Sequence, residues 1–119
     1  MKFSILQKEP KKDLLIILDN TDGLKQTILT KEETAYVQKA HKDNHALVTL
    51  NRYDKHIFIY IPENKPTDWQ FSESIRETGA SVQGIASKHK IGELSIHNLS
   101  KHTRAAYLLA EGMTLANYQ

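Results

Sequence analysis

Six histidines are the side chains of this sequence best suited to binding a metal, and two of them have a helical spacing. His41 and His45 are four residues apart, so on one helix they would share a face, as in helical zinc sites. Asp43 and Asn44 between them are typical of a helix end, and the glutamate of the zinc-peptidase motif is missing. The other four are scattered along the chain: His56, His89, His97 and His102. The sequence therefore predicts no metal site, and the histidines are interpreted as solvated or helix-end residues.

Catalytic chemistry needs a nucleophile or a pair of carboxylates in a pocket lined by backbone donors. The glycines that could build such a pocket do not cluster: they are Gly23, Gly79, Gly84, Gly92 and Gly112. Phosphate-binding loop, dinucleotide fingerprint and nucleophile elbow are all missing from the sequence. Glu73 and Glu77, with Arg76 between them, are interpreted as the solvated face of a helix. We therefore predict no catalytic residue and no cofactor-binding residue in this chain.

Two further groups have a structural and a functional interpretation. Lys88-His89-Lys90 is typical of a cationic helix end, and the alternative is a phosphate site. Trp69 is interpreted as a hydrophobic anchor at the start of a helix, and the alternative is a platform for stacking.

The bulk composition indicates one globular domain spanning residues 1–119, with 39% hydrophobic and 25% charged residues. The chain has no cysteine, which excludes disulfides and thiolate chemistry. A formal net charge of +2 argues against nucleic acid as a partner, although Lys8, Lys11, Lys12, Lys88 and Lys90 could contact it. No signal-peptide core and no uncharged run of 18 residues is present, so we expect a soluble, cytoplasmic protein without a membrane partner.

The pattern of apolar residues predicts strands and helices in alternation. Strands are expected at Lys2–Leu6, Leu14–Leu18, Ala46–Leu50, His56–Ile61 and Gly92–His97. One helix should begin at the capping box Thr30/Glu33 and end near Lys42, and a second should begin near Thr67 and end near His89. Within the second, Gly79 and Ala86 are small enough for close approach to a sheet. Strands that are apolar on both faces need helices on both sides. The expected fold is therefore α/β, a three-layer arrangement with a mixed β-sheet of about five strands and helices on both faces, in the order ββαββαβα.

The last stretch, Lys101 to Gln119, predicts a helix with an unusually wide apolar arc, capped by Asn98 or Ser100. Between Ala105 and Ala116, only Glu111, Gly112 and Thr114 interrupt the apolar and aromatic residues. An ordinary core helix and a helix with an added interdomain contact both remain possible interpretations. In the second, the contact residues are Tyr107, Ala110, Met113 and Tyr118, which should leave an exposed apolar patch on the isolated domain.

The segment Ala105 to Gln119 resembles the helix that closes the N-terminal domain of leucyl (cytosol) aminopeptidases. In that family an Ala-rich start leads to a Glu-Gly pair, an apolar turn and a Tyr shortly before the catalytic domain, as at Glu111-Gly112 and Tyr118 here. The preceding helix to Lys90 and the strand from Gly92 fit the same layout. This chain departs from longer family members in its first third, where a glycine-containing loop and helix are shortened to Lys8–Lys12.

The resemblance implies a macro-domain-like, noncatalytic N-terminal domain that serves oligomer assembly, as a hexamer, and access to the active site. Its partner would be the catalytic C-terminal domain of the same polypeptide, which carries two divalent metal ions, zinc or manganese, on Lys, Asp and Glu ligands. The family's Asn-Thr-Asp-Ala-Glu-Gly-Arg signature has no match here, so no catalytic residue is transferred to this chain. The alternative hypothesis is a free-standing macro-domain-like module that binds a nucleotide or an ADP-ribose group.

Overall fold

The computed structural model describes residues 2–6, 13–53 and 55–117, with side chains described from residue 13 onward. In chain order its elements are β1 (Lys2–Leu6), β2 (Leu14–Ile17), the 3-10 helix η1 (Thr21–Gln26), α1 (Lys31–Lys42), β3 (Leu47–Asn51), β4 (His56–Tyr60), α2 (Asp68–Lys88), β5 (Glu93–Asn98) and α3 (Ala105–Asn117). The predicted α/β class with a mixed sheet is confirmed. The 3-10 helix between β2 and α1 was not predicted.

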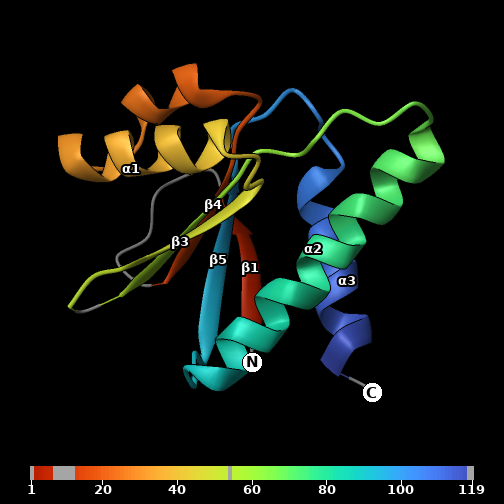
Figure 1. Ribbon diagram of the computed structural model, residues 1–119. Helices are drawn as coiled ribbons and strands as arrows, with labels where there is room; N and C mark the ends of the chain where they lie inside the picture. Colours follow the sequence, from red (N-terminus) through yellow and green to blue (C-terminus); the bar gives the residue numbers. More distant parts are fainter. Residues whose placement is uncertain (1, 7–12, 54, 118–119) are drawn as a thin grey trace.

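The strands form one sheet in the order β1-β5-β2-β4-β3 (Figure 1). β1 pairs with β5, β5 with β2 and β2 with β4 in parallel, whereas β3 pairs with β4 in an antiparallel hairpin. β2 therefore lies inside the sheet with a partner on each side. Both faces of such a central strand are covered when helices pack on the two sides of the sheet. An uninterrupted apolar sequence fits this position, because neither face then meets solvent.

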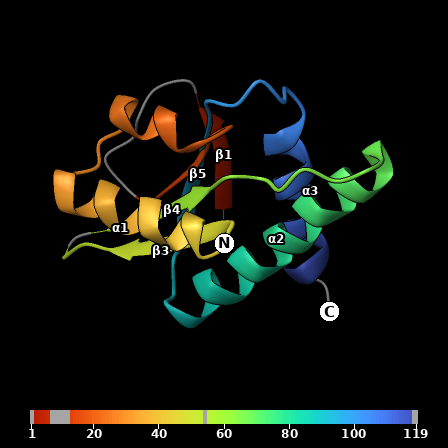
Figure 2. The ribbon, with the colours of Figure 1, turned by 45° about the horizontal axis from the view of Figure 1, so that its top comes forward.

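Helices cover the two faces of the sheet unequally: α1 and η1 lie on one side, and α2 and α3 lie on the other (Figures 1 and 2). Alternation along the strands divides the core accordingly. Leu15 and Ile17 join the cluster beneath α2 and α3, whereas Leu14 and Ile16 join the cluster beneath α1. All four side chains have no exposed surface.

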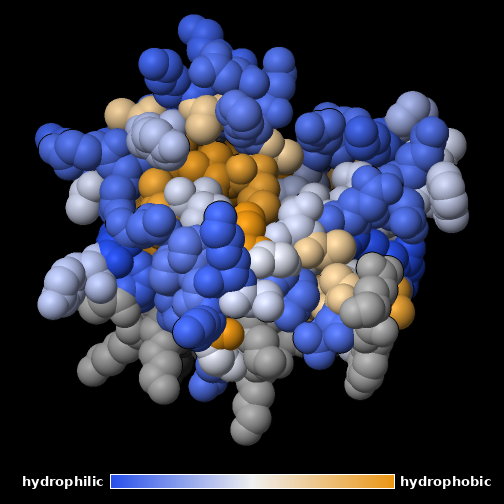
Figure 3. Space-filling model, turned by 60° about the horizontal axis from the view of Figure 1, so that its bottom comes forward, coloured by the Kyte–Doolittle hydropathy of each residue, from blue (hydrophilic) through white to orange (hydrophobic). Residues whose placement is uncertain are grey.

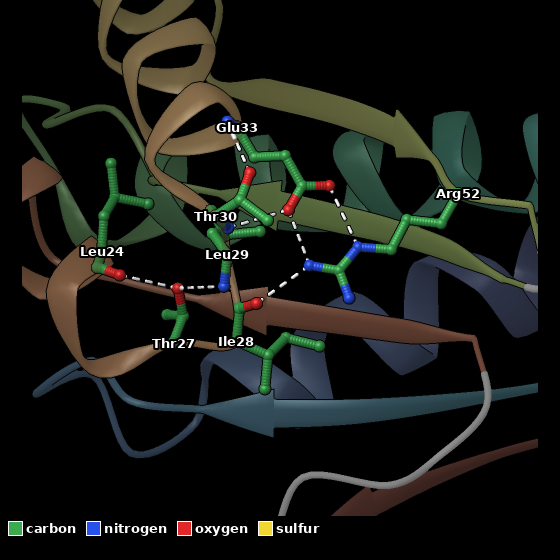
Figure 4. A network of polar contacts seen from close by, with 7 residues as sticks. All are labelled: Leu24, Thr27, Ile28, Leu29, Thr30, Glu33 and Arg52. Atoms are coloured by element: carbon green, nitrogen blue, oxygen red, sulfur yellow. Dashed lines mark hydrogen bonds and ion pairs between the residues drawn. The ribbon is translucent and has the colours of Figure 1, made fainter.

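The start of α1 confirms the predicted capping box and extends it into a polar network (Figure 4). Thr30 Oγ1 accepts the Glu33 N–H, and the Glu33 carboxylate accepts the Thr30 N–H. The same carboxylate accepts two hydrogen bonds from Arg52, at 2.6 and 3.0 Å, and Arg52 also donates to the Ile28 carbonyl. Hydrogen bonding by Arg52 is the largest of the effects that lower the pKa of Glu33 to about 2. The network ties the start of α1 to the end of β3.

α2 and α3 cross with their backbones almost in contact, because each has a glycine at the crossing. A Cβ added to Gly79 would collide with the Leu109 carbonyl, and one added to Gly112 would collide with the Arg76 carbonyl. The prediction that Gly79 approaches a sheet is therefore wrong: it faces α3. Hydrogen bonds lie on the same helix pair, from Arg76 Nε to Glu111 at 2.7 Å and from Gln83 to Asn117 at 3.3 Å.

The start of α3 differs from the prediction, since the helix begins at Ala105 rather than near Lys101. Asn98 and Ser100 are not its caps, because their side chains are used in the turn that precedes the helix. Asn98 Nδ2 donates to the His102 carbonyl, and Asn98 Oδ1 accepts from the N–H and hydroxyl of Ser100. Across the described ranges, no helix combines the length and the apolar character needed to cross a bilayer.

Candidate functional site

The best candidate for a binding site lies at the edge of the sheet where its parallel strands end. β2, β4 and β5 are mutually parallel, so the segments that follow them emerge at one edge. In open α/β sheets, ligands bind at this carboxyl edge, where helix N-termini also lie. In this fold the edge carries the start of α2, after β4, and the start of α3, after β5 (Figure 1).

A pocket of about 360 Å³ lies between the first turns of α2 and α3. From α2 its wall includes Asp68, Phe71, Ser72 and Ile75, and from the segment leading into α3 it includes Lys101, His102, Thr103, Arg104, Ala105 and Leu108. The pocket is therefore polar at its rim and apolar at the helix faces.

Contacts from three elements hold the segment that contributes the cationic side of this pocket. The Asp19 carboxylate, which follows β2, accepts the Lys101 N–H at 3.0 and 3.2 Å. The His102 ring packs against the Phe71 ring of α2 with centroids 4.6 Å apart. Asn98 at the end of β5 binds the His102 carbonyl at 2.9 Å. The segment 98–102 is thus fixed against both α2 and the sheet.

The electrostatics of the pocket favour an anion on the α3 side. Lys101 and Arg104 are exposed cations at its rim. Arg104 directly precedes α3, and its side chain has no acceptor, so it cannot cap the N–H groups of the first turn, of which the Ala105 N–H donates to the His102 carbonyl at 3.0 Å. Such N–H groups, with the helix dipole, attract phosphate or carboxylate groups. Asp68 on the α2 side opposes this, which places the anion-binding capacity next to Arg104.

A second pocket, of about 270 Å³, lies between β4 and the middle of α2. Tyr60, with 1% of its surface exposed, lines this pocket together with polar residues that include Glu63, Glu77 and Ser81. Burial raises the pKa of the Tyr60 phenol, whose buried hydroxyl has no hydrogen-bond partner among the described residues. The phenol therefore stays protonated at neutral pH and can act as a hydrogen-bond donor.

The structure confirms the predicted helix end between His41 and His45. α1 ends at Lys42, so His41 lies on the helix and His45 beyond it, and the two do not share a helical face. A contact not evident from the sequence joins the His56 and His89 rings, whose centroids are 5.0 Å apart. Asp13 Oδ1 lies 3.3 Å from His56 Nδ1. Among the residues that the structure describes, no group of three or more His, Asp or Glu is placed to hold a metal ion.

The four predicted interdomain contact residues do not form one surface. Tyr107 is 67% exposed, whereas Ala110 and Met113 are only 7% and 0% exposed. The prediction that Ala110 and Met113 belong to an exposed apolar patch is therefore wrong. Both belong to the core cluster shared by α2, α3 and the sheet, on the inward side of the helix. Tyr118 lies outside the described residues. Leu115, which was not among the predicted contacts, is 57% exposed.

Two other sequence-based interpretations concern α2. Trp69 is 71% exposed, so its prediction as a hydrophobic anchor is wrong. The buried positions of α2 are Ile75, Gly79, Val82 and Ala86, and Trp69 lies about 120° around the helix from that line. The interpretation of Glu73 and Arg76 as members of a surface charge pattern agrees with their hydrogen bond at 3.5 Å.

Comparisons of this chain with protein-family models, with curated proteins and with solved structures find no match.

Proposed function

We propose that this chain is the noncatalytic N-terminal domain of a leucyl-aminopeptidase-like metallopeptidase. In this proposal the domain serves oligomer assembly, as a hexamer, and access to an active site carried by a C-terminal domain of the same polypeptide. That domain would use two divalent ions, zinc or manganese, to activate water for removal of N-terminal amino acids. The site of action is cytoplasmic.

The observation that carries this proposal is the outer face of α3. Its inner face is completely packed, with Ala105, Leu109 and Met113 at 0% exposure. The opposite side nevertheless carries two large apolar residues, Tyr107 and Leu115, both more than half exposed. Exposed apolar groups on a helix that already has a full core suit contact with another domain. This is the helix whose sequence resembles the one leading into the catalytic domain of the family.

The proposal is tested first by activity of residues 1–119. We expect no hydrolysis of a leucyl anilide with manganese or zinc, and metal-dependent turnover by this chain would overturn the assignment. The second test is the coding sequence beyond Gln119, which should encode a metal signature of Lys, Asp and Glu residues. A stop codon at that point would contradict the proposal.

The third test uses the longer protein encoded by that sequence. Replacing Tyr107 and Leu115 together by serine should weaken the contact between the domains and so expose the linker to limited proteolysis. Lys31→Ser, on the exposed start of α1, is the matched control and should leave the cleavage rate unchanged. Equal cleavage rates for all three proteins would exclude the α3 face as an interdomain contact.

The second candidate function is a free-standing, macro-domain-like module that binds a nucleotide or an ADP-ribose group. It is favoured by the pocket beside the start of α3, where Lys101, His102 and Arg104 line the wall next to the positive end of the helix dipole. Calorimetry with ADP-ribose tests it: binding that Arg104→Glu abolishes and Lys31→Glu leaves unchanged would support it. No heat of binding at millimolar ligand would contradict it.

A further inference from the structure

The hairpin strand β3 forms one end of the sheet, and in the described part of the chain it pairs only with β4. An edge strand presents backbone N–H and C=O groups that another strand can bind. The hydrogen-bond pattern of the hairpin shows which groups these are. The Ile61 N–H donates to the Ala46 carbonyl at 2.9 Å, and the Arg52 N–H donates to the Lys55 carbonyl at 2.8 Å.

In an antiparallel ladder, alternate residues of a strand direct their N–H and C=O groups to the same side. Residues 46 and 52 bind toward β4, so Val48 and Leu50 between them do the same. The intervening residues, Leu47, Thr49 and Asn51, therefore direct their backbone groups outward from the sheet. They make three successive donor and acceptor pairs along the edge.

The devices that usually protect such an edge are missing from β3. The strand contains no lysine, no proline, no glycine and no inward-pointing charge. Apolar residues also reach the surface around β3, in the area between α1 and α2 that hydrophilic residues surround (Figure 3). Ala46 and Leu47 are partly buried and pack against the core cluster beneath α2 and α3.

We propose that this edge pairs with β3 of a second copy of the chain, antiparallel and with the two-fold axis through Thr49. In that register Thr49 faces Thr49 of the second copy, and Leu47 faces Asn51. All three outward residues then lie in hydrogen-bonded pairs, so their donors and acceptors are satisfied together. The two sheets become one continuous sheet across the axis.

The side chains of β3 fit a second copy for two reasons. Val48 faces Leu50 of the second copy on the α1 side, so an apolar pair extends the cluster already beneath α1. No charged side chain lies on the strand, so the two-fold arrangement brings no like charges together. This inference rests on the oligomer-assembly part of the proposed function and names the surface that would carry it.

Sedimentation equilibrium and amide hydrogen exchange on residues 1–119 test the pairing. We expect a reversible dimer in which the Thr49 amide exchanges more slowly as concentration rises, while the Val48 amide, already bound to β4, changes little. Thr49→Pro removes the outward N–H at the axis and should weaken the dimer by at least about 10-fold, and Thr49→Val, which keeps the N–H, should not. A circular dichroism spectrum like that of the unmodified chain is the folding control.

A charge exchange at the axis provides a test that does not depend on proline. Thr49→Lys alone and Thr49→Glu alone should each be mainly monomeric, because like charges would face each other directly. A mixture of the two should form a heterodimer that salt weakens. A monomer at all concentrations, or a dimer that both charged variants leave unchanged, would overturn the pairing. Neither result bears on the metal signature beyond Gln119, so failure of this inference is distinguishable from failure of the proposed function.

Discussion

Replacement of Gly112 by alanine should destabilise this fold, because it adds a methyl group where α3 crosses α2. The added Cβ would fall inside the van der Waals radius of the Arg76 carbonyl and close to the Arg76 Cα at 2.8 Å. These are backbone atoms of α2, so the clash cannot be relieved by rotation of a side chain. Separation of the helices would also disturb the hydrogen bond from Arg76 to Glu111.

The expected loss combines two opposing terms. Overpacking of a close contact costs about 1–3 kcal/mol, and the upper end applies because backbone must move. Alanine in place of glycine inside a helix raises the free energy of unfolding by about 0.5–1 kcal/mol through helix propensity. The net loss is about 2 kcal/mol, which corresponds to a fall of about 6–12 °C in the melting temperature of a domain of this size. Gly79→Ala, which meets the Leu109 carbonyl, should behave similarly.

Gly84→Ala is the matched control. Gly84 lies in α2, as Gly79 does, but a Cβ added to it meets nothing within 4 Å. The substitution should raise the free energy of unfolding by about 0.5–1 kcal/mol through helix propensity alone. Urea and thermal unfolding followed by circular dichroism measure all three variants. If Gly112→Ala were as stable as Gly84→Ala, the close crossing of α2 and α3 would be wrong.

Three further predictions concern caps and titrating groups. Arg52 holds the pKa of Glu33 at about 2, below its ordinary 4.5, so the stability from this pair is complete above about pH 4.5 and is lost as pH falls toward 2. Glu33→Gln should cost about 1 kcal/mol at pH 7 and remove that acid dependence in urea titrations. Thr67→Ala deletes the side chain that caps α2 at Gln70 N–H, and should cost about 1 kcal/mol in the same assay. Burial raises the pKa of Tyr60 above its ordinary 10.0, so the stability that its neutral form contributes is complete below about pH 10 and is lost as pH rises from there through the raised value. Tyr60→Phe should reduce this loss in alkaline unfolding curves, and equal curves would refute it.

Local signals in the sequence were sufficient for most helices and strands. Thr30 and Glu33 are three residues apart, and this spacing alone allows the reciprocal hydrogen bonds found at the start of α1. The apolar run from Leu14 required cover on both faces, and the structure places separate core clusters on the two sides of β2. These features depend on neighbouring residues, so they can be read from the chain without its tertiary contacts.

The features that failed depend on which surfaces meet. The spacing of Gly79 showed that a close approach was needed, but only the fold decided that its neighbour is α3 rather than the sheet. The wide apolar arc of α3 was evident from the sequence, yet the crossing with α2 decided that Met113 is buried and Leu115 exposed. A helical pattern specifies which residues share a face, but not how many neighbours cover it.

The candidate binding pocket also belongs to what only the tertiary structure decided. Phe71 and His102 are 31 positions apart in the numbering, and no pattern in either segment indicates that their rings pack together. The sequence by itself determined the α/β class, the capping of α1 and α2 and the apolar character of the last helix. Parallel pairing of β2, β4 and β5 then brought the starts of α2 and α3 to one edge, because the carboxyl ends of parallel strands meet there.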